Sequence, residues 1–175
     1  MPIDSMPTKI KTFTDNLETV SATFNQTKIL PESTKRFIST GYVKFVKNTG
    51  FTWHITKPSN TVFTSTLSTY CVNGESAELS KLPYFYQIQN MIDKMLNGDM
   101  NDFLYAFNVD YVEKSDNWTM FATPRLTNIA DLIQDLTIYG SETDLDKIIM
   151  TYSDGTIVIL EFKKMKTELS DEIAC

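Results

Sequence analysis

Apolar side chains near the start of the chain recur at steps of three and four, which is the spacing of one face of a helix. The stripe consists of Ile10, Phe13, Leu17, Val20 and Phe24. It predicts a helix from about Thr8 to Thr23. Beyond this helix the period changes, so a different kind of element is expected to follow.

The next part of the chain alternates with a period of two, which is typical of β-strands. Residues 34–47 read as one strand, and residues 51–56 read as a second strand in which apolar and polar side chains alternate. The triplet Asn48-Thr49-Gly50 between them is a turn signal. Two further short strands are predicted over residues 61–65 and 68–72.

The middle of the chain returns to helical spacing. Pro83 suits a first helical position, and Gly98 suits the position after a helix end. Asp99 can then cap a second, short helix. The apolar positions of the two predicted helices are Phe85, Ile88, Met91, Ile92, Met95, Phe103, Leu104 and Phe107.

The last third of the chain is again strand-like. Strands are predicted over residues 108–114, 118–123, 133–139, 145–152 and 156–163, with a helical turn at 128–132. The order of helix, strands, helices and strands indicates an α+β fold with a mostly antiparallel sheet. This order lacks the βαβ rhythm of a nucleotide-binding, doubly wound sheet.

Length and charge narrow the possible partners. The 175 residues fit a single domain, 1–175, with a core over about residues 8–163 and a flexible charged tail at 164–175. The net charge is −6 and no basic run exceeds Lys163-Lys164, so we expect no nucleic-acid partner and no anionic membrane surface. The first nine residues contain no apolar signal-peptide core.

Residues with candidate chemistry are sparse in the sequence. The single histidine, His54, lies on an alternating strand without a second ligand nearby, and is interpreted as a surface residue. Glu142, Asp144 and Asp146 are interpreted as a solvated acidic loop. The sequence also contains neither a glycine-rich phosphate loop nor a nucleophile elbow. We therefore expect no catalytic residue, no metal site and no cofactor.

The two cysteines leave one question open. Cys71 and Cys175 lie 104 residues apart and fit no metal-binding spacing. They are either a buried thiol and a loose terminal thiol, or a disulfide in an oxidising compartment.

The aromatic content, 11 Phe, 8 Tyr and 2 Trp, fits either a thick core or an apolar cavity. If the central helices cover a curved sheet, aromatic rings and thioethers line the space between them. Alternatively, the same groups pack on one another and fill the core. The candidate cavity residues are Val43, Phe45, Phe51, Trp53, Ile55, Phe85, Ile88, Met91, Met95, Phe103 and Phe107.

Five short segments carry a family likeness when they are taken together and in order. They are Phe24-Asn25-Gln26-Thr27-Lys28, the strand pair from Ser39 to Pro58, Leu96-Asn97-Gly98-Asp99, the strand from Trp118 to Pro124, and Ser153-Asp154-Gly155-Thr156. The set resembles the F-x-Q-x-K segment, the W-x-x-x-x-P strand, the LxGD segment, the L-T-P strand end and the DGT hairpin of the LolA-like outer-membrane lipoprotein carriers. The resemblance extends over roughly residues 10–162.

This resemblance implies a fold and a task. LolA-like proteins form an incomplete β-barrel covered by a helical lid. They carry the acyl chains of lipoproteins across the periplasm, from an inner-membrane transporter to an outer-membrane receptor. Some members of the branch with LxGD accompany lipid biosynthesis, which extends the expected cargo to related lipids. The resemblance therefore implies a periplasmic, monomeric and non-catalytic carrier.

One position departs from the family pattern. The family places an arginine in the turn before the tryptophan strand, where it helps to hold the lid closed. Lys47 is the matching lid-control candidate here, although an ammonium lacks the planar fork of donors.

Two alternatives to the carrier function stay open. One is a protein-interaction module with the same fold and a filled core. The other is an enzyme acting on a lipid, which would need an acid–base pair inside the cavity.

Overall fold

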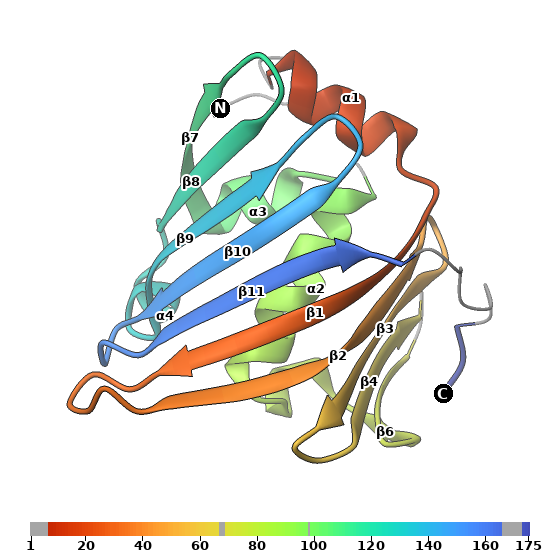
Figure 1. Ribbon diagram of the computed structural model, residues 1–175, viewed down its shortest axis with the longest axis vertical. Coiled ribbons are helices and arrows are strands. Elements are labelled where there is room, and N and C mark those ends of the chain that lie inside the picture. The colour runs from red at the N-terminus through yellow and green to blue at the C-terminus, as the bar shows by residue number, and fades with distance from the viewer. Residues whose placement is uncertain (1–6, 67–68, 98, 166–172) are drawn as a thin grey trace.

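The computed structural model describes residues 7–66, 69–97, 99–165 and 173–175. Over these ranges the strands form one antiparallel sheet (Figure 1). The strands are β1 (Thr19–Ile29), β2 (Arg36–Val46), β3 (Gly50–Lys57), β4 (Thr61–Thr66), β5 (Tyr70–Val72), β6 (Glu75–Ala77), β7 (Phe107–Glu113), β8 (Trp118–Pro124), β9 (Ile133–Gly140), β10 (Leu145–Tyr152) and β11 (Ile157–Lys164).

The strand order across the sheet is β6-β5-β4-β3-β2-β1-β11-β10-β9-β8-β7. The first and last strands are therefore neighbours in the middle of the sheet, with Phe24 of β1 opposite Phe162 of β11. The outermost strands β6 and β7 do not pair with each other, so the sheet curves without closing. This arrangement confirms the predicted α+β fold with an incomplete barrel.

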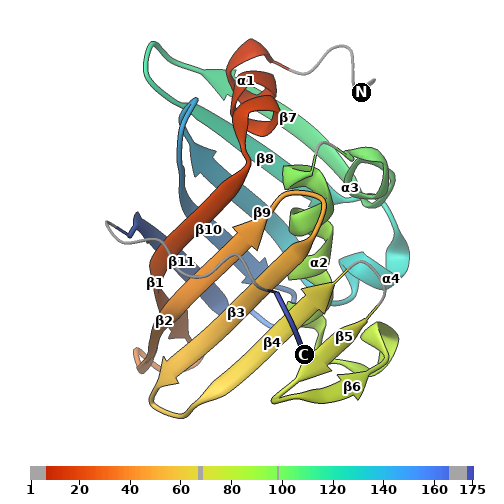
Figure 2. The same ribbon diagram turned by 90° about the vertical axis from the view of Figure 1, so that its right-hand side faces the viewer.

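The helices lie at both ends of the sheet and inside its curve (Figure 1). They are α1 (Thr8–Asn16), the 3-10 turn η2 (Leu79–Lys81), α2 (Tyr84–Leu96), α3 (Asn101–Ala106) and α4 (Thr127–Ala130). The connection between the two edge strands carries α2 and α3, and Figure 2 shows the sheet bending around them. Ile88, Ile92 and Met95 of α2 are buried, so the predicted apolar stripe does face the sheet.

The predicted first helix is too long. Helix α1 ends at Asn16 and β1 begins at Thr19, so Thr19–Thr23 is strand instead of helix. Val20 and Phe24 continue the helical stripe, but together with Ala22 they also repeat at steps of two. The stretch pairs with β2 on one side and, from Ala22, with β11 on the other. Long-range strand pairing thus overrides the local helical period.

Phe107 is likewise not helical. Helix α3 ends at Ala106, and Phe107 opens β7 opposite Pro124. Its ring stays buried and stacks on the ring of Phe103, with the centroids 4.9 Å apart. The short strand β6 has no counterpart among the predicted elements, because three residues are too few to show a period.

A disulfide joins Cys71 in β5 to Cys175 at the end of the chain, with the two Cα atoms 5.8 Å apart. Of the two possibilities that the sequence leaves open, the structure has the bridge. Figure 2 shows the C-terminal residue beside β4. Residues 166–172 of the predicted flexible tail lie outside the described residues, whereas the last residue of that tail is covalently tied to the sheet.

Candidate functional site: an apolar cavity between the sheet and helix α2

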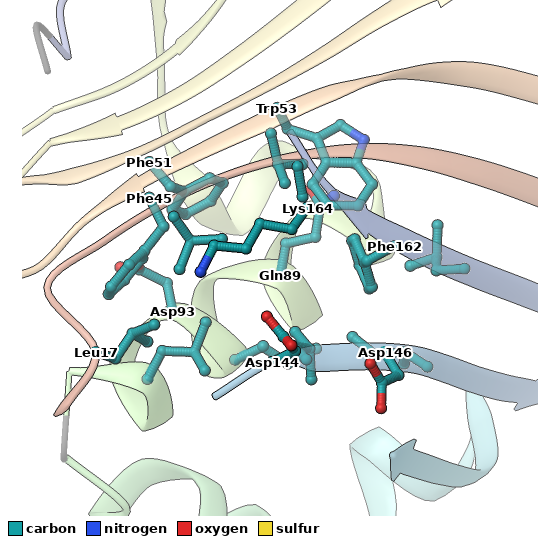
Figure 3. Close-up of a pocket in the computed structure, with 18 of the residues that line it drawn as sticks. Leu17, Phe45, Phe51, Trp53, Gln89, Asp93, Asp144, Asp146, Phe162 and Lys164 are labelled. Carbon is teal, nitrogen blue, oxygen red and sulfur yellow. The ribbon is translucent and has the colours of Figure 1, made fainter. Parts of the chain in front are cut away.

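A cavity of about 320 Å³ lies between the concave face of the sheet and helices α1 and α2. Ligand pockets in proteins commonly have volumes of about 300–1000 Å³, so this one suits a slender ligand. Figure 3 shows aromatic rings from β2, β3 and β11 facing α2 across it. The apolar wall consists of Phe13, Leu17, Val20, Ala22, Val43, Phe45, Phe51, Trp53, Ile88, Ile92, Leu96, Leu145, Ile148, Met150, Leu160 and Phe162.

Strand register brings the wall together. Residues directly opposite each other in an antiparallel pair project to the same face of the sheet. One row across β1, β2 and β3 is Val20, Phe45 and Phe51, and the next row is Ala22, Val43 and Trp53. Because β11 pairs with the other side of β1, Leu160 and Phe162 extend the same face.

Trp53 is the centre of the aromatic part of the wall. Its indole is 7% exposed and stacks on Phe24 with ring centroids 4.4 Å apart and planes at 25°. The edge of Phe162 meets it at 6.0 Å and 82°. Offset stacking and edge-to-face contact are the arrangements that aromatic quadrupoles favour. The indole is therefore held in place before any ligand enters.

The predicted cavity residues divide into those that line the cavity, those that pack elsewhere in the core, and one whose side chain is not described. Val43, Phe45, Phe51, Trp53 and Ile88 line the cavity. Among the others, Ile55 and Met91 are half-buried and pack against the core, while three more are fully buried away from the cavity: Met95, Phe103 and Phe107. The side chain of Phe85 lies outside the described part of the structure.

Sequence reasoning missed the contribution of the two ends of the chain. The lining includes Phe13 of α1 and Leu17 just after that helix. It also includes Ile148 and Met150 of β10 and Leu160 of β11. The alternation of β10 and β11 is visible in the sequence, so these positions could be identified as one strand face. The pairing of β11 with β1 brings that face to the cavity, and no local pattern encodes a pairing between the first and last strands.

Two polar side chains of α2 interrupt the apolar wall. Gln89 is 7% exposed and lines the cavity with Asp93 one turn later. Neither amide atom of Gln89, nor Oδ1 of Asp93, has a hydrogen-bond partner among the described residues. Burial raises the pKa of Asp93 to about 7, and the adjacent Lys94 offsets part of this effect. The cavity therefore contains a titratable group that the sequence interpretation did not foresee.

Charged residues of both signs lie at the rim. Asp144 and Asp146, which the sequence places in a solvated loop, lie beside the cavity with Lys163 and Lys164. Figure 3 shows Lys164 extending over the cavity from β11 and the two aspartates on the opposite side. Burial, and then the neighbouring Asp144, raise the pKa of Asp146. The rim is thus polar, whereas the interior is mainly apolar.

The turn between β2 and β3 contacts both α1 and α2. The Lys47 ammonium donates to the carbonyl oxygens of Thr14 (2.9 Å) and Asp15 (3.4 Å) at the end of α1. The backbone N–H of Asn48 donates to Oδ1 of Asn97, which follows the last turn of α2, at 2.7 Å. Lys47 therefore holds α1, and the contact from this turn to α2 is made by Asn48.

Neither a metal-ligating cluster nor a membrane-spanning helix occurs among the described residues. No three His, Cys, Asp or Glu side chains come together there in a way that could hold a metal ion. None of the helices in that part of the chain has the length and apolar character needed to cross a membrane.

Comparison with known proteins extends over nearly the whole chain. Two solved structures resemble the fold: a LolA superfamily protein from Nitrosomonas europaea (TM-score 0.46, 11% identity, 93% of this chain and 94% of that chain covered) and the lipoprotein LppX from Mycobacterium tuberculosis (TM-score 0.43, 9% identity, 93% and 96% covered). No curated protein sequence matches. The sequence profile of the family described as outer membrane lipoprotein carrier protein LolA matches residues 15–173. Because that match spans far more than half of the chain, the protein belongs to the LolA family, as its short segments predict.

Proposed function

We propose that the protein is a periplasmic carrier that holds the acyl chains of lipoproteins, or of related lipids, in the cavity between the sheet and α2. The observation that carries this proposal is the cavity itself. A ring of apolar side chains from α1, α2, β1–β3, β10 and β11 surrounds a space of about 320 Å³. Its polar rim would leave the head group of the cargo in contact with water.

The energetics of acyl chains fit such a site. Each buried methylene contributes about 0.8 kcal/mol, so a long chain gains on the order of 10 kcal/mol before its entropy losses are counted. The alternative, an interaction module with a filled core, would leave no cavity of this size. The cavity therefore favours the carrier over that alternative.

Release of such cargo requires the cavity to open. Helices α2 and α3 form the connection between the two edge strands β6 and β7, and they cover the concave face. The Asn48–Asn97 hydrogen bond links the end of α2 to the β2–β3 turn. We propose that α2 swings away when this contact breaks and that no covalent chemistry takes place, so the cycle is one of binding, closure and hand-off.

The proposed partners and the proposed cellular location are those of the LolA family. In this proposal the cargo arrives from an inner-membrane transporter and leaves to an outer-membrane receptor, and the carrier itself travels as a monomer. The Cys71–Cys175 disulfide supports a location outside the cytoplasm, because structural disulfides persist in oxidising compartments.

The test is displacement of the dye ANS by a long-chain acyl ligand or a lipidated peptide. We expect saturable displacement at one ligand per protein. Val20→Trp would fill the cavity and weaken binding about ten-fold or more, whereas Val112→Trp, on the exposed side of β7, would leave it unchanged. Circular dichroism checks that both variants fold. A folded wild-type protein that binds no acyl ligand would overturn the proposal.

A further inference from the structure

Gln89 and Asp93 form a polar spot in the cavity wall, separate from the charged rim. The two residues are four positions apart on α2 and therefore lie one above the other on the same helix face. Ile88, Ile92 and Leu96 of the same helix line the cavity around them. Figure 3 shows both side chains facing the aromatic rings of the opposite wall.

These side chains have hydrogen-bonding capacity that the described part of the protein does not use. The Gln89 side chain is 93% buried, and both its Nε2 donor and its Oε1 acceptor lack partners within the described ranges. The same holds for Oδ1 of Asp93. Buried polar groups are normally paired, and unpaired ones in a cavity point to a ligand or to ordered water.

The chemistry of the two groups defines what would satisfy them. A primary amide needs an acceptor for its N–H and a donor for its oxygen. Burial raises the pKa of Asp93 to about 7, so its carboxyl is protonated in a large fraction of molecules near neutral pH and can donate. A hydrocarbon segment at this spot would displace water and leave all of these atoms unpaired.

The surrounding charges do not favour an anion at this spot. Lys94, the cation next to Asp93 on α2, is bound to Asp102, and Lys44 donates to Oγ of Ser21. Lys163 and Lys164 lie at the rim together with Asp144 and Asp146, which carry the opposite charge. Within the described ranges, a carboxylate placed beside Asp93 would meet a second acid whose neighbouring cation, Lys94, is already paired with Asp102.

We propose that Gln89 and Asp93 form a polar subsite that selects acyl compounds in which a neutral group next to the chain both donates and accepts a hydrogen bond, such as a secondary amide. The inference rests on the proposed carrier function and adds a cargo class to it. Fatty carboxylates and simple esters are the disfavoured classes, since an ester lacks the donor and a carboxylate adds a charge.

A matched pair of probes tests the subsite. N-methylhexadecanamide and methyl hexadecanoate differ only in an N–H against an oxygen, and each is titrated against the ANS-loaded 175-residue protein. We expect the amide to bind about ten-fold more tightly than the ester, which is the usual effect of leaving buried polar groups unpaired. Hexadecanoate at pH 8 should bind more weakly than the amide.

Substitutions at Gln89 test whether this residue causes the preference for the amide over the ester. Gln89→Leu, and Gln89→Met as a second variant of similar length, should bring the amide-to-ester ratio close to one. The matched control is Gln87→Leu on the same helix, whose side chain donates to the Leu82 carbonyl and does not line the cavity. This control should keep the wild-type ratio.

The other outcomes overturn either the subsite alone or both proposals. Equal binding of both probes to the wild-type protein, or a ratio that survives in folded Gln89→Leu and Gln89→Met proteins, overturns the subsite and leaves the carrier function standing. Failure of the folded wild-type protein to bind either probe overturns both proposals.

Discussion

At the scale of single residues, burial strongly shifts the pKa of Asp93. Its carboxyl has a pKa of 3.8 in an exposed setting, and burial raises this value to about 7 in the folded protein. The folded state therefore holds a proton that the unfolded state has lost between these two pH values. By linkage, the free energy of unfolding falls as the pH rises from about 4 to about 7.

Replacing this residue should remove that pH dependence. Asp93→Asn keeps the shape of the side chain and cannot ionise, so it should be more stable than the wild-type protein above pH 7. The expected gain is on the order of 2 kcal/mol, because some remaining contact with water screens the charge. Urea unfolding of both proteins from pH 4 to pH 8 measures the difference, which should shrink as the pH falls. A difference that does not change with pH would contradict the assignment.

Substitutions of the two tryptophans distinguish an effect on stability from an effect on acyl binding. Trp53 lines the cavity, whereas Trp118 is 1% exposed, packs on Phe13 and does not line it. Trp53→Ala and Trp118→Ala should each lower the free energy of unfolding by about 3–5 kcal/mol. Only Trp53→Ala should also weaken acyl binding among molecules that remain folded. Thermal unfolding and ANS displacement measure the two effects, and equal losses of affinity would argue against a binding role for Trp53.

At the scale of secondary-structure elements, patterns confined to one segment are well predicted from the sequence. The hairpin of β2 and β3 and the helix α2 have clear periods and turn or cap signals. Residues 19–23 satisfied two periods at once, and only the pairing of β1 with β2 and β11 decided between them. Phe107 shows the same limit, because its helical spacing gave way to the ladder with β8.

The candidate site was predictable to a similar extent. Five of the proposed wall residues, Val43, Phe45, Phe51, Trp53 and Ile88, line the cavity because they share a strand face or a helix face. Met95 and Phe103 lie on correctly predicted helices but pack in the core beside the cavity, since the tilt of a helix on a sheet is not encoded in its period. The polar pair on α2 is visible only as an interruption of an apolar stripe.

The link between α2 and the β2–β3 turn gives a prediction about cargo release. Asn97→Ala removes the acceptor of the Asn48 N–H, and with it a hydrogen bond worth about 1 kcal/mol. The acyl ligand should then leave about five-fold faster, as measured by stopped-flow displacement. Asn117→Ala, in an exposed turn, is the matched control and should leave the rate unchanged. An unchanged rate in Asn97→Ala would place the opening element elsewhere.

At the scale of the whole molecule, the sheet is an open ring of strands whose two edge strands are joined through α2 and α3. The disulfide ties the last residue of the sequence to β5. The Cys71–Cys175 disulfide connects positions 104 residues apart and so restricts the unfolded chain strongly. Cys71 is 2% exposed, whereas Cys175 at the other end of the bridge is exposed.

Removal of the bridge should therefore lower stability without altering the cavity. Cys175→Ser is expected to reduce the free energy of unfolding by about 2–4 kcal/mol, and a reductant should reproduce this loss in the wild-type protein. Urea unfolding with and without reductant measures it. Acyl affinity should stay the same, because neither cysteine lines the cavity. If the unfolding midpoint of the wild-type protein is the same with and without reductant during unfolding, the presence of the bridge is contradicted.

The proposed function requires that an acyl chain occupies the space between α2 and the sheet. The most direct measurement is NMR of methyl groups in the presence of a long-chain N-methyl acyl amide with a nitroxide on its chain. We expect the methyl signals of Val20, Ile88 and Leu160 to broaden first, and those of the exposed Val112 and Leu132 to broaden last. Broadening that begins at Val112 and Leu132, or that spares the cavity methyls at saturation, would contradict it.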